Sequence, residues 1–361
     1  MDLVVNPPLL PMLAKRVSEL PSGDGWTYEP KWDGFRTIVF KDRDEVFLQS
    51  RDEKPLNRYF PELLAPLAAA LPERCVLDGE IVIARGGALD FEALQLRLHP
   101  AASRAKLLSE QIPASIAFFD LLCEGDEDLR PLPFAERRRR LEAAVGGVKP
   151  PLHVTPATVD RALAEDWFRR FEGAGFDGVM AKAASGAYAP NKREWFKVKH
   201  ERECDCVVAG FRWHKKGGKT RVGSLLLGLF DDSGKLDHVG VCASFSDAKR
   251  TELVSFLSAY RENALAAHPW RAWAAHDVEG GDAHRMPGGQ SRWSQGKDLS
   301  WEPLRPELVV EVAYDHMEGN RFRHTAQFRR FRPDKRPEEC TFAQLEVVPP
   351  EEVSRIFGSG R

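Results

Sequence analysis

Two predicted strands each carry a pair of like-charged side chains spaced two residues apart. Asp78 and Glu80 lie in the apolar stretch 75–84, and Lys197 and Lys199 lie in a later one. Because successive side chains alternate between the faces of a strand, the members of each pair share a face. Burying two carboxylates without partners is costly, so the first pair must face a cleft, a cation or a polar ligand. Two parallel ammonium groups suit a phosphate.

Four further short motifs combine charged, aromatic and glycine residues. In residues 29–36 (EPKWDGFR), Lys31 has a polar, charged neighbourhood and a glycine that would let backbone approach a ligand. In residues 177–182 (DGVMAK), Asp177 and Lys182 are five residues apart, so their side chains would face opposite sides of a strand unless the strand stops or bulges between them. The other two are 118–120 (FFD) and 332–335 (RPDK). Each motif alone is weak evidence, because Lys-x-Asp-Gly occurs by chance and paired aromatic residues usually belong to a core.

The elements that must position these motifs differ between the two parts of the chain. Up to about residue 200, stretches typical of strands alternate with stretches of helical spacing. Residues 115–122 are mostly apolar, which predicts a strand buried on both faces. The arginines of 137–140 lie on a basic amphipathic helix and are expected on its solvated face. Strands are predicted over 35–40, 45–50, 75–84, 115–122, 177–182 and 194–199, and helices over 58–70, 134–145 and 158–172.

After His200 the pattern changes to several strands and a single helix, which Ser246 can cap. Residues 275–300 are rich in glycine, serine and polar residues and predict a long loop. Several strands and one helix in about 150 residues are typical of a small β-barrel of the OB type. The predicted fold class is therefore α+β, with domains of residues 1–203 and 204–361. The strands of the second domain are predicted over 205–211, 222–230, 237–245 and 306–314.

The composition excludes several classes of protein. Apolar residues make up 43% of the chain and charged residues 29%, which is the balance of a globular protein with a core. The longest apolar stretches are much shorter than the roughly 20 residues of a membrane-spanning helix, and the proline-rich N-terminus is a poor signal peptide. We therefore expect a cytoplasmic, reducing location and no membrane. The six cysteines give no disulfide framework, and Cys204 and Cys206 lack a second pair at the spacing of a zinc site.

Charge is unevenly distributed along the chain. The net charge of −2 does not indicate a nucleic-acid-binding protein. However, residues 211–221 carry five lysines and arginines and no acidic residue, and residues 321–336 carry seven against Asp334. Because local patches set the field that a polyanion meets, these two segments favour a phosphate-bearing partner.

Taken together, the motifs resemble those of the ATP-dependent DNA ligases, within the covalent nucleotidyltransferase superfamily. All six motifs of that family occur in order across residues 31–335, so the resemblance covers nearly the whole chain. We expect no separate DNA-binding domain ahead of Lys31, as in the small bacterial enzymes. Segments 309–316 (VVEVAYDH) and 328–340 (FRRFRPDKRPEEC) are most similar to the bacterial ligase C group. The resemblance implies an adenylation (nucleotidyltransferase) domain with antiparallel sheets and flanking helices, followed by an OB-fold domain.

The resemblance also implies a three-step reaction. Lys31 attacks the α-phosphate of ATP and releases pyrophosphate, AMP passes to the 5′-phosphate of a nick, and the 3′-hydroxyl then displaces AMP. Lys31 must first lose its proton, and an unperturbed lysine has a pKa of about 10.4. Mg²⁺ (or Mn²⁺) and neighbouring lysines would favour the neutral amine. Segment 200–206 would be the hinge between the domains.

Roles follow from the resemblance residue by residue. Glu29 would read the adenine amino group, Phe119 would stack on the adenine ring, and Arg36 and Glu80 would hold the ribose. The family motif that begins here with Asp177 usually begins with glutamate, and the shorter side chain would move a metal or admit a water. The remaining implied roles are catalysis with Lys31 by Asp33, metal binding by Glu80 and Asp177, contact with the α-phosphate by Lys182, Lys197 and Lys199, binding of the 5′-phosphate of the nick by Arg51, and orientation of pyrophosphate by Arg332, Asp334 and Lys335.

Two alternative functions differ in class from each other. An RNA ligase or an mRNA-capping guanylyltransferase shares the chemistry, but FFD and RPDK favour a DNA ligase that uses ATP. A DNA-end-binding protein with a decayed site is disfavoured by the intact motif lysines. A P-loop is excluded because Trp213 stands where that motif needs a glycine before Gly218. We expect a monomer that acts on nicked duplex DNA at the bacterial nucleoid, with repair polymerases or end-binding proteins as candidate partners.

Overall fold

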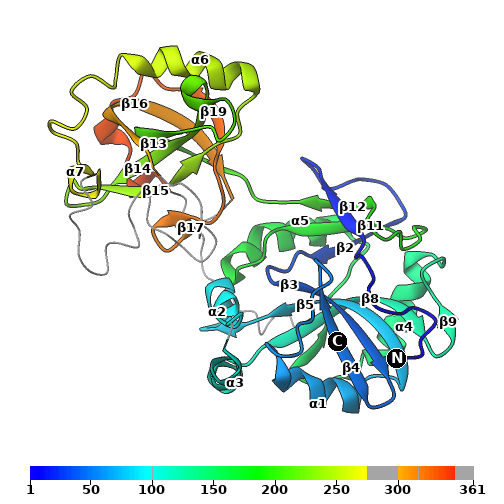
Figure 1. Cartoon of the computed structure of the whole chain (residues 1–361). Coiled ribbons are helices and arrows are strands. Elements are labelled where there is room, and N and C mark those ends of the chain that lie inside the picture. Colours follow the sequence, from blue (N-terminus) through cyan, green and yellow to red (C-terminus); the bar gives the residue numbers. More distant parts are fainter. Residues whose placement is uncertain (100, 275–299, 316, 346–361) are drawn as a thin grey trace. The chain divides into compact units, whose positions relative to one another are not determined.

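The computed structural model describes residues 1–99, 101–274, 300–315 and 317–345, and the chain forms two compact units. The first unit comprises Met1–His200, and the second unit begins at Glu201 (Figure 1). Residues 275–299, most of the predicted loop, lie outside the described residues.

The larger sheet of the first unit has two long strands at its centre, β5 and β8. Eight of the ten residues of β8 are buried, so this strand is covered on both faces, as its apolar sequence predicts. A short strand, β9 (Glu127–Asp128), pairs with β8 outside the main path of the sheet. In spatial order the strands are β10 (Leu152–Val154), β8 (Ser115–Glu124), β5 (Arg74–Val82), β3 (Phe35–Asp42) and β4 (Glu45–Ser50).

The smaller sheet of the first unit carries the other motif strands. Its outer strand β1 pairs in parallel with β12, and β10 pairs in parallel with β8 in the larger sheet, whereas the other pairs in the two sheets are antiparallel. The sheets are therefore mixed, and both parallel pairs involve short strands that the sequence pattern does not predict. The spatial order is β1 (Leu13–Arg16), β12 (Arg193–Val198), β11 (Val179–Ala183) and β2 (Trp26–Pro30).

Helices flank these sheets, as predicted. The helix α4 matches the predicted range 134–145 in full, whereas α1 begins later than predicted, with Pro61 in its first turn. Asp160 caps α5, which packs against β2, and a 3₁₀ turn follows it at Phe171–Ala174. A short hairpin joins β6 (Ala84–Arg85) to β7 (Ala88–Leu89). The helices are α1 (Pro61–Ala70), α2 (Phe91–Leu96), α3 (Ala102–Gln111), α4 (Phe134–Val145) and α5 (Arg161–Arg170).

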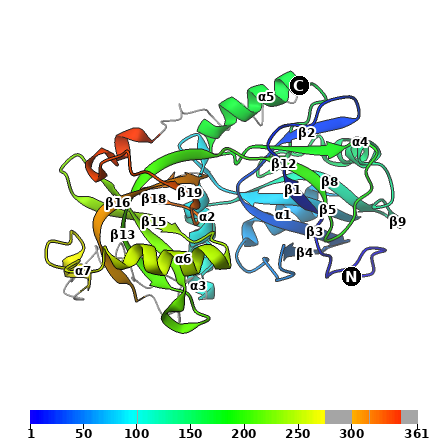
Figure 2. The ribbon, with the colours of Figure 1, turned by 90° about the horizontal axis from the view of Figure 1, so that it is seen from above.

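The second unit is a five-stranded antiparallel sheet that curves around one core, the OB-type arrangement predicted. A parallel bridge between Cys242 and Ala326 connects the end of β15 to the residue that precedes β19, so the two outer strands approach each other. The helix α6 (Asp247–Ser258) packs against β14, and Figure 2 shows it in front of the strands of this unit. The Ser246 hydroxyl caps it by accepting from the Lys249 amide at 3.2 Å. The strands are β15 (Leu236–Cys242), β14 (Val222–Phe230), β13 (Arg202–Trp213), β16 (Glu302–Tyr314) and β19 (Gln327–Phe331), with α7 (Arg271–Ala274) and the hairpin β17 (Met317–Glu318)–β18 (Arg321–Phe322) beside them.

The cysteines are six buried free thiols. Cys204 and Cys206 share one face of β13, with their sulfurs 3.6 Å apart. Within the described residues, no three histidine, cysteine or acidic side chains are grouped so that they could hold a metal ion. None of the helices in that part of the chain has the length and apolar character of a membrane span.

Candidate active site

Eight of the residues predicted for the site line one open cleft in the first unit. Asp33, Asp177 and Lys199 do not line it directly, and the RPDK motif belongs to the second unit. The eight are Glu29, Lys31, Arg36, Arg51, Glu80, Phe119, Lys182 and Lys197. The other lining residues are Pro11, Met12, Leu13, Ala14, Pro30, Trp32, Met180, Arg193 and Trp195.

Backbone contacts between two motifs fix Lys31 at the end of β2. The Lys31 amide donates to the Gly178 carbonyl at 2.8 Å, and the Asp177 amide donates to the Lys31 carbonyl at 2.9 Å. Gly178 has φ +127°, and a Cβ there would lie 2.0 Å from the Val198 carbonyl oxygen. A Cβ on Gly34 would lie 2.2 Å from a carbonyl oxygen of β5. Both motif glycines therefore allow protein strands to approach each other, whereas the sequence suggested an approach to a ligand at Gly34.

Asp177 holds the Lys31 side chain through an ion pair. Lys31 Nζ and Lys199 Nζ lie 2.6 Å and 2.7 Å from the same Asp177 oxygen. Burial opposes the charged form of Lys31, but the attraction of Asp177 prevails and raises the pKa of the lysine. Burial also disfavours the Asp177 carboxylate, yet the two lysines lower its pKa to about 2. Lys31 is therefore an ammonium group in this state, and its direct partner is the Asp177 carboxylate, with Lys199 on the same oxygen.

Lys197 lies in the same cleft with a much weaker hold on its proton. Burial is the largest cause, and the positive charges of Lys31 and Lys199 add to it, so the pKa of Lys197 falls to about 8. A negatively charged ligand beside such a lysine would favour its charged form. Lys197 is therefore a strong candidate for contact with phosphate.

Lys182 and Glu29 form a buried pair beside aromatic rings. The Lys182 ammonium lies 2.6 Å from Glu29 Oε2, and both side chains are at most 2% exposed. It also lies 4.6 Å from the Phe119 ring centroid and 4.4 Å from that of Trp195. In the β11–β2 register Met180 pairs with Glu29, so Lys182, two residues on, projects from the same face. Lys182 thus pairs with Glu29 and lines the cleft, and its contact with the α-phosphate stays a prediction.

Two arginines of α4 contact carboxylates of these motifs. This contradicts the prediction that the arginines of 137–140 lie on a solvated face. Arg137 is fully buried and donates to both oxygens of Asp120 at 2.8 Å and 2.9 Å. Arg138 donates to Glu29 Oε1 at 3.3 Å and to the Thr155 carbonyl at 2.6 Å. Carboxylates of the EPKWDGFR and FFD motifs pair with these cations and offset the free-energy cost of burying them.

The two carboxylates of β5 have different environments. Asp78 is buried and accepts from Arg36 at 2.5 Å and 2.6 Å and from the Tyr188 hydroxyl at 2.6 Å, so its partners belong to the protein. Glu80 faces the cleft, as its position on the strand predicts. Burial raises the pKa of Glu80 to about 7, although the positive charges of Arg36 and Lys31 oppose the shift.

Glu80 is better placed than Asp177 to bind a divalent cation. Among the described residues Glu80 makes no ion pair, and a carboxylate oxygen in a cleft is the kind of ligand that Mg²⁺ prefers. Asp177 is shared by two lysine ammonium groups, so it could bind a metal only if those ion pairs were broken.

Comparison with known proteins identifies the family. Residues 11–199 match the family described as "ATP dependent DNA ligase domain", and residues 218–335 match "ATP dependent DNA ligase C terminal region". The chain belongs to the ATP-dependent DNA ligases. It is 56% identical over 353 residues to DNA ligase C2 of Mycolicibacterium smegmatis, with 97% of each chain covered. It is 54% identical to DNA ligase C of Mycobacterium tuberculosis, with 96% of each covered. The resemblance to the ligase C group is thereby confirmed.

A solved structure supports the fold of this ligase. A structure described as a minimal-scaffold Lig E DNA ligase aligns with a TM-score of 0.55 over 90% of this chain and 100% of that one. At 17% identity, it shows likeness of fold alone. Membership of the family establishes ATP as a substrate and nicked DNA as the molecule to be joined.

Some lining residues of this ligase have no predicted role. Met180 lies inside the DGVMAK motif, and Trp195 lies in the predicted strand 194–199. The shared strand face of Met180 and Lys182 is the signal that could have identified Met180. Arg193 begins β12 and lies opposite Leu13. Met12 and its neighbours belong to a segment whose β1 strand is short and parallel, and its sequence carries no signal that would place it at the cleft.

Proposed function

We propose that this enzyme seals nicks in duplex DNA through a covalent lysyl-AMP on Lys31, in DNA repair. The observation that carries the proposal is the composition of one cleft. It combines a lysine held by a carboxylate, a second lysine with a pKa of about 8, and an aromatic and carboxylate environment suited to a base. A nucleotide needs all three kinds of contact at once.

Recognition of the base falls to the buried end of the cleft. Glu29 accepts a hydrogen bond from the adenine amino group, and Phe119 and Met180 enclose the ring. Lys182 and Arg138 position the Glu29 carboxylate, because both contact it directly. Arg36, held by Asp78 and 4.7 Å from the Phe119 ring centroid, fixes that ring and contacts the ribose.

Attack on ATP requires neutral Lys31. Asp177 keeps Nζ in place as an ammonium, and the positive charges of Lys197 and Lys199 reduce the cost of losing the proton. The new bond forms between Nζ and the α-phosphorus, the bond from that phosphorus to the bridging oxygen of the β-phosphate breaks, and pyrophosphate leaves. The protons that Nζ loses pass to water, because Asp177, with a pKa of about 2, is too weak a base to retain them. Glu80 would hold Mg²⁺ or Mn²⁺, which supplies charge that neutralises phosphate oxygens. Asp33 adds negative charge near Lys31.

The remaining assignments concern the DNA and the second unit. Arg51, which lines the cleft, binds the 5′-phosphate of the nick. The β13–β14 turn exposes three lysines that would meet backbone phosphate, with affinity that falls as salt rises. Arg332, Asp334 and Lys335 orient pyrophosphate. Residues 1–203 and 204–361 form the two domains, and segment 200–206 is the hinge. The enzyme acts as a monomer at the nucleoid, with repair polymerases or end-binding proteins as partners.

The test combines nucleotide choice with substrate choice. The protein, first stripped of bound AMP, is incubated with Mg²⁺ and α-labelled ATP or GTP, and label on the protein is read on a denaturing gel. We expect label from ATP alone, and its transfer to a nicked DNA duplex. Equal label from GTP, or faster joining of a nicked RNA duplex than of DNA, would contradict the proposal.

Binding of ATP is expected to weaken above pH 8 because Lys197 loses its proton. The shift leaves Lys197 charged below about pH 8 and neutral above it, whereas the pKa of Lys31 is raised and its charge persists. The Kd of a non-hydrolysable ATP analogue, measured by calorimetry from about pH 7.5 to 9.5, where Glu80 with its pKa of about 7 is already mostly ionised, should rise roughly fivefold. In Lys197→Arg the guanidinium stays charged, so the rise should vanish. The same rise in that variant would show that another group titrates.

A further inference from the structure

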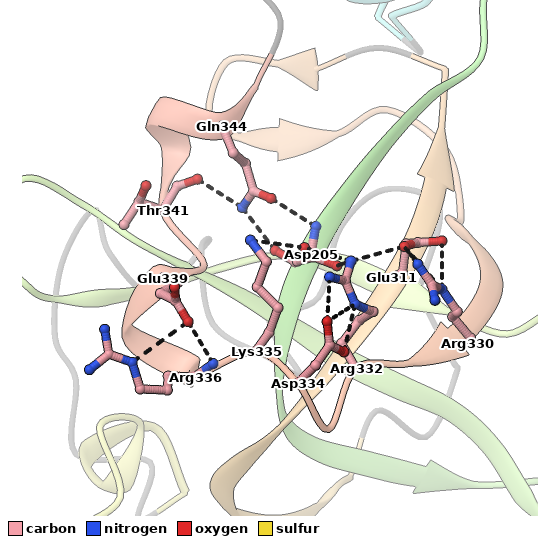
Figure 3. Close-up of polar contacts among 10 residues, drawn as sticks. All are labelled: Asp205, Glu311, Arg330, Arg332, Asp334, Lys335, Arg336, Glu339, Thr341 and Gln344. Carbon is pink, nitrogen blue, oxygen red and sulfur yellow. Dashed lines mark hydrogen bonds and ion pairs between the residues drawn. The ribbon is translucent and has the colours of Figure 1, made fainter.

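Arg332 of the RPDK motif is held between two carboxylates on adjacent strands of the second unit (Figure 3). Asp205 on β13 and Glu311 on β16 are direct partners in the antiparallel register. Like charges in such a pair repel each other unless a cation lies between them. Arg332 Nη1 lies 3.1 Å and 3.2 Å from the Asp205 oxygens and 3.1 Å from Glu311 Oε2, so it provides that cation.

The same guanidinium also organises the rest of the motif. Its Nε and Nη2 donate to Asp334 at 3.0 Å and 2.8 Å, and Lys335 Nζ lies 3.5 Å from Asp205 Oδ2. Each of the three Arg332 nitrogens therefore donates to a carboxylate. Asp334 is 62% exposed, whereas Arg332 is 16% exposed. Arg332 is thus the anchor of the motif, and Asp334 and Lys335 are its accessible members.

Asp205 has the fixed position that such an anchor requires. Its amide donates to Gln344 Oε1 at 2.8 Å, and its carbonyl accepts from Gln344 Nε2 at 2.9 Å. On the other side, Arg330 pairs with Glu311 at 2.9 Å. The backbone of Asp205 and the carboxylate of Glu311 are therefore held by contacts other than those with Arg332. Asp205 lies outside the motifs quoted above, and Glu311 lies in the ligase C segment 309–316, where no role was predicted for it.

The charges of the cluster balance. Three cations (Arg330, Arg332, Lys335) face three carboxylates (Asp205, Glu311, Asp334). Removing one of the shared carboxylates leaves Arg332 with fewer contacts that define its orientation, and it releases Lys335 from its ion partner. A misplacement of about 1 Å in a group that orients a reacting phosphate can slow a reaction by about 100-fold.

We propose that Asp205, assisted by Glu311, is a positioning residue for the first step of ligation. It orients Arg332 and thereby presents Asp334 and Lys335 to the pyrophosphate of ATP. This inference rests on the proposed function of the RPDK motif in lysine adenylation. Neither Asp205 nor Glu311 is expected to touch the nucleotide, so loss of either charge should affect the step that releases pyrophosphate and spare the later joining step.

The experiment separates the steps in the full-length enzyme. Adenylation is followed with α-labelled ATP over a range of concentrations, and joining is followed with a nick that already carries AMP on its 5′-phosphate. Asp205→Asn keeps the size of the side chain and the backbone bonds to Gln344. We expect the maximal rate of adenylation to fall 10- to 100-fold and the joining rate to change less than twofold. Glu311→Gln should show the same pattern with a smaller fall.

A matched control lies on the same strand. Glu307→Gln removes one carboxylate of β16 that pairs with Arg305, outside the cluster, and should change neither step. An equal loss of both steps in Asp205→Asn, together with a lower melting temperature, would assign the residue a purely structural role and overturn the inference. If Arg332→Ala slows adenylation and Asp205→Asn does not, the inference alone fails. If Arg332→Ala leaves adenylation unchanged, the proposed role of the motif fails with it.

Discussion

Replacement of Lys31 by alanine is expected to abolish transfer of label from ATP to the protein, with a fall of at least about 10⁴-fold. The amine is the atom that forms the new bond, and removing a nucleophile leaves no substitute at the same position. Joining of a nick that already carries AMP does not use this bond, so its rate should stay within about tenfold. The measurement is single-turnover labelling beside joining of the adenylated nick.

The matched variant is Lys31→Arg. It retains a cation for Asp177, which otherwise loses one of its two lysine partners. It should be as inactive in labelling as the alanine variant while it keeps the charge balance of the site. Labelling that persists in both variants and maps to Lys197, the cleft lysine with a pKa of about 8, would show that the nucleophile is wrongly assigned.

Much of the cleft could be predicted from strand alternation and motif order. Glu80 faces the cleft because the residues of β5 alternate between the two faces of the sheet. The pairing of Asp177 with Lys31 could not be predicted in the same way, since β11 begins at Val179 and Asp177 precedes it. The pairing of Lys182 with Glu29 could not be predicted for a related reason. Its partner is chosen by the register of β11 against β2, and register is a long-range property that no local pattern contains.

The fold shows the same division between local and long-range information. Long strands and helices with continuous periodicity, such as β8 and α4, appear where they were predicted. The short strands β1 and β10 were missed, because four and three residues carry too little pattern and both are fixed by pairing with distant strands.

The arginines of α4 are the clearest failure of sequence patterning. Four consecutive arginines look like a solvated face, and Arg139 and Arg140 do pair with Glu136 near the surface. Arg137 and Arg138 instead turn toward carboxylates from motifs far away in the sequence. Charge alone cannot distinguish the two cases, because the partner that allows burial is brought by the tertiary fold.

Replacement of Arg137 by methionine is therefore expected to lower the free energy of unfolding by about 3–5 kcal/mol, since it leaves the Asp120 carboxylate buried without its partner. Both side chains of the pair are 0% exposed. Arg139→Met, two residues away on a 67% exposed side chain, should leave the free energy of unfolding nearly unchanged. Urea denaturation of the full chain compares the two variants.

A double variant shows whether the effect belongs to the pair. Asp120→Asn combined with Arg137→Met removes both charges, so it should recover part of the stability that Arg137→Met loses. Asp120 follows Phe119 on β8, and its negative charge acts on Lys182. Arg137→Met, which takes away the partner of Asp120, should therefore also weaken ATP binding. Equal stability of Arg137→Met and Arg139→Met would mean that the buried pair contributes nothing, and the contrast within this one run of arginines would then have to be explained by helix packing instead.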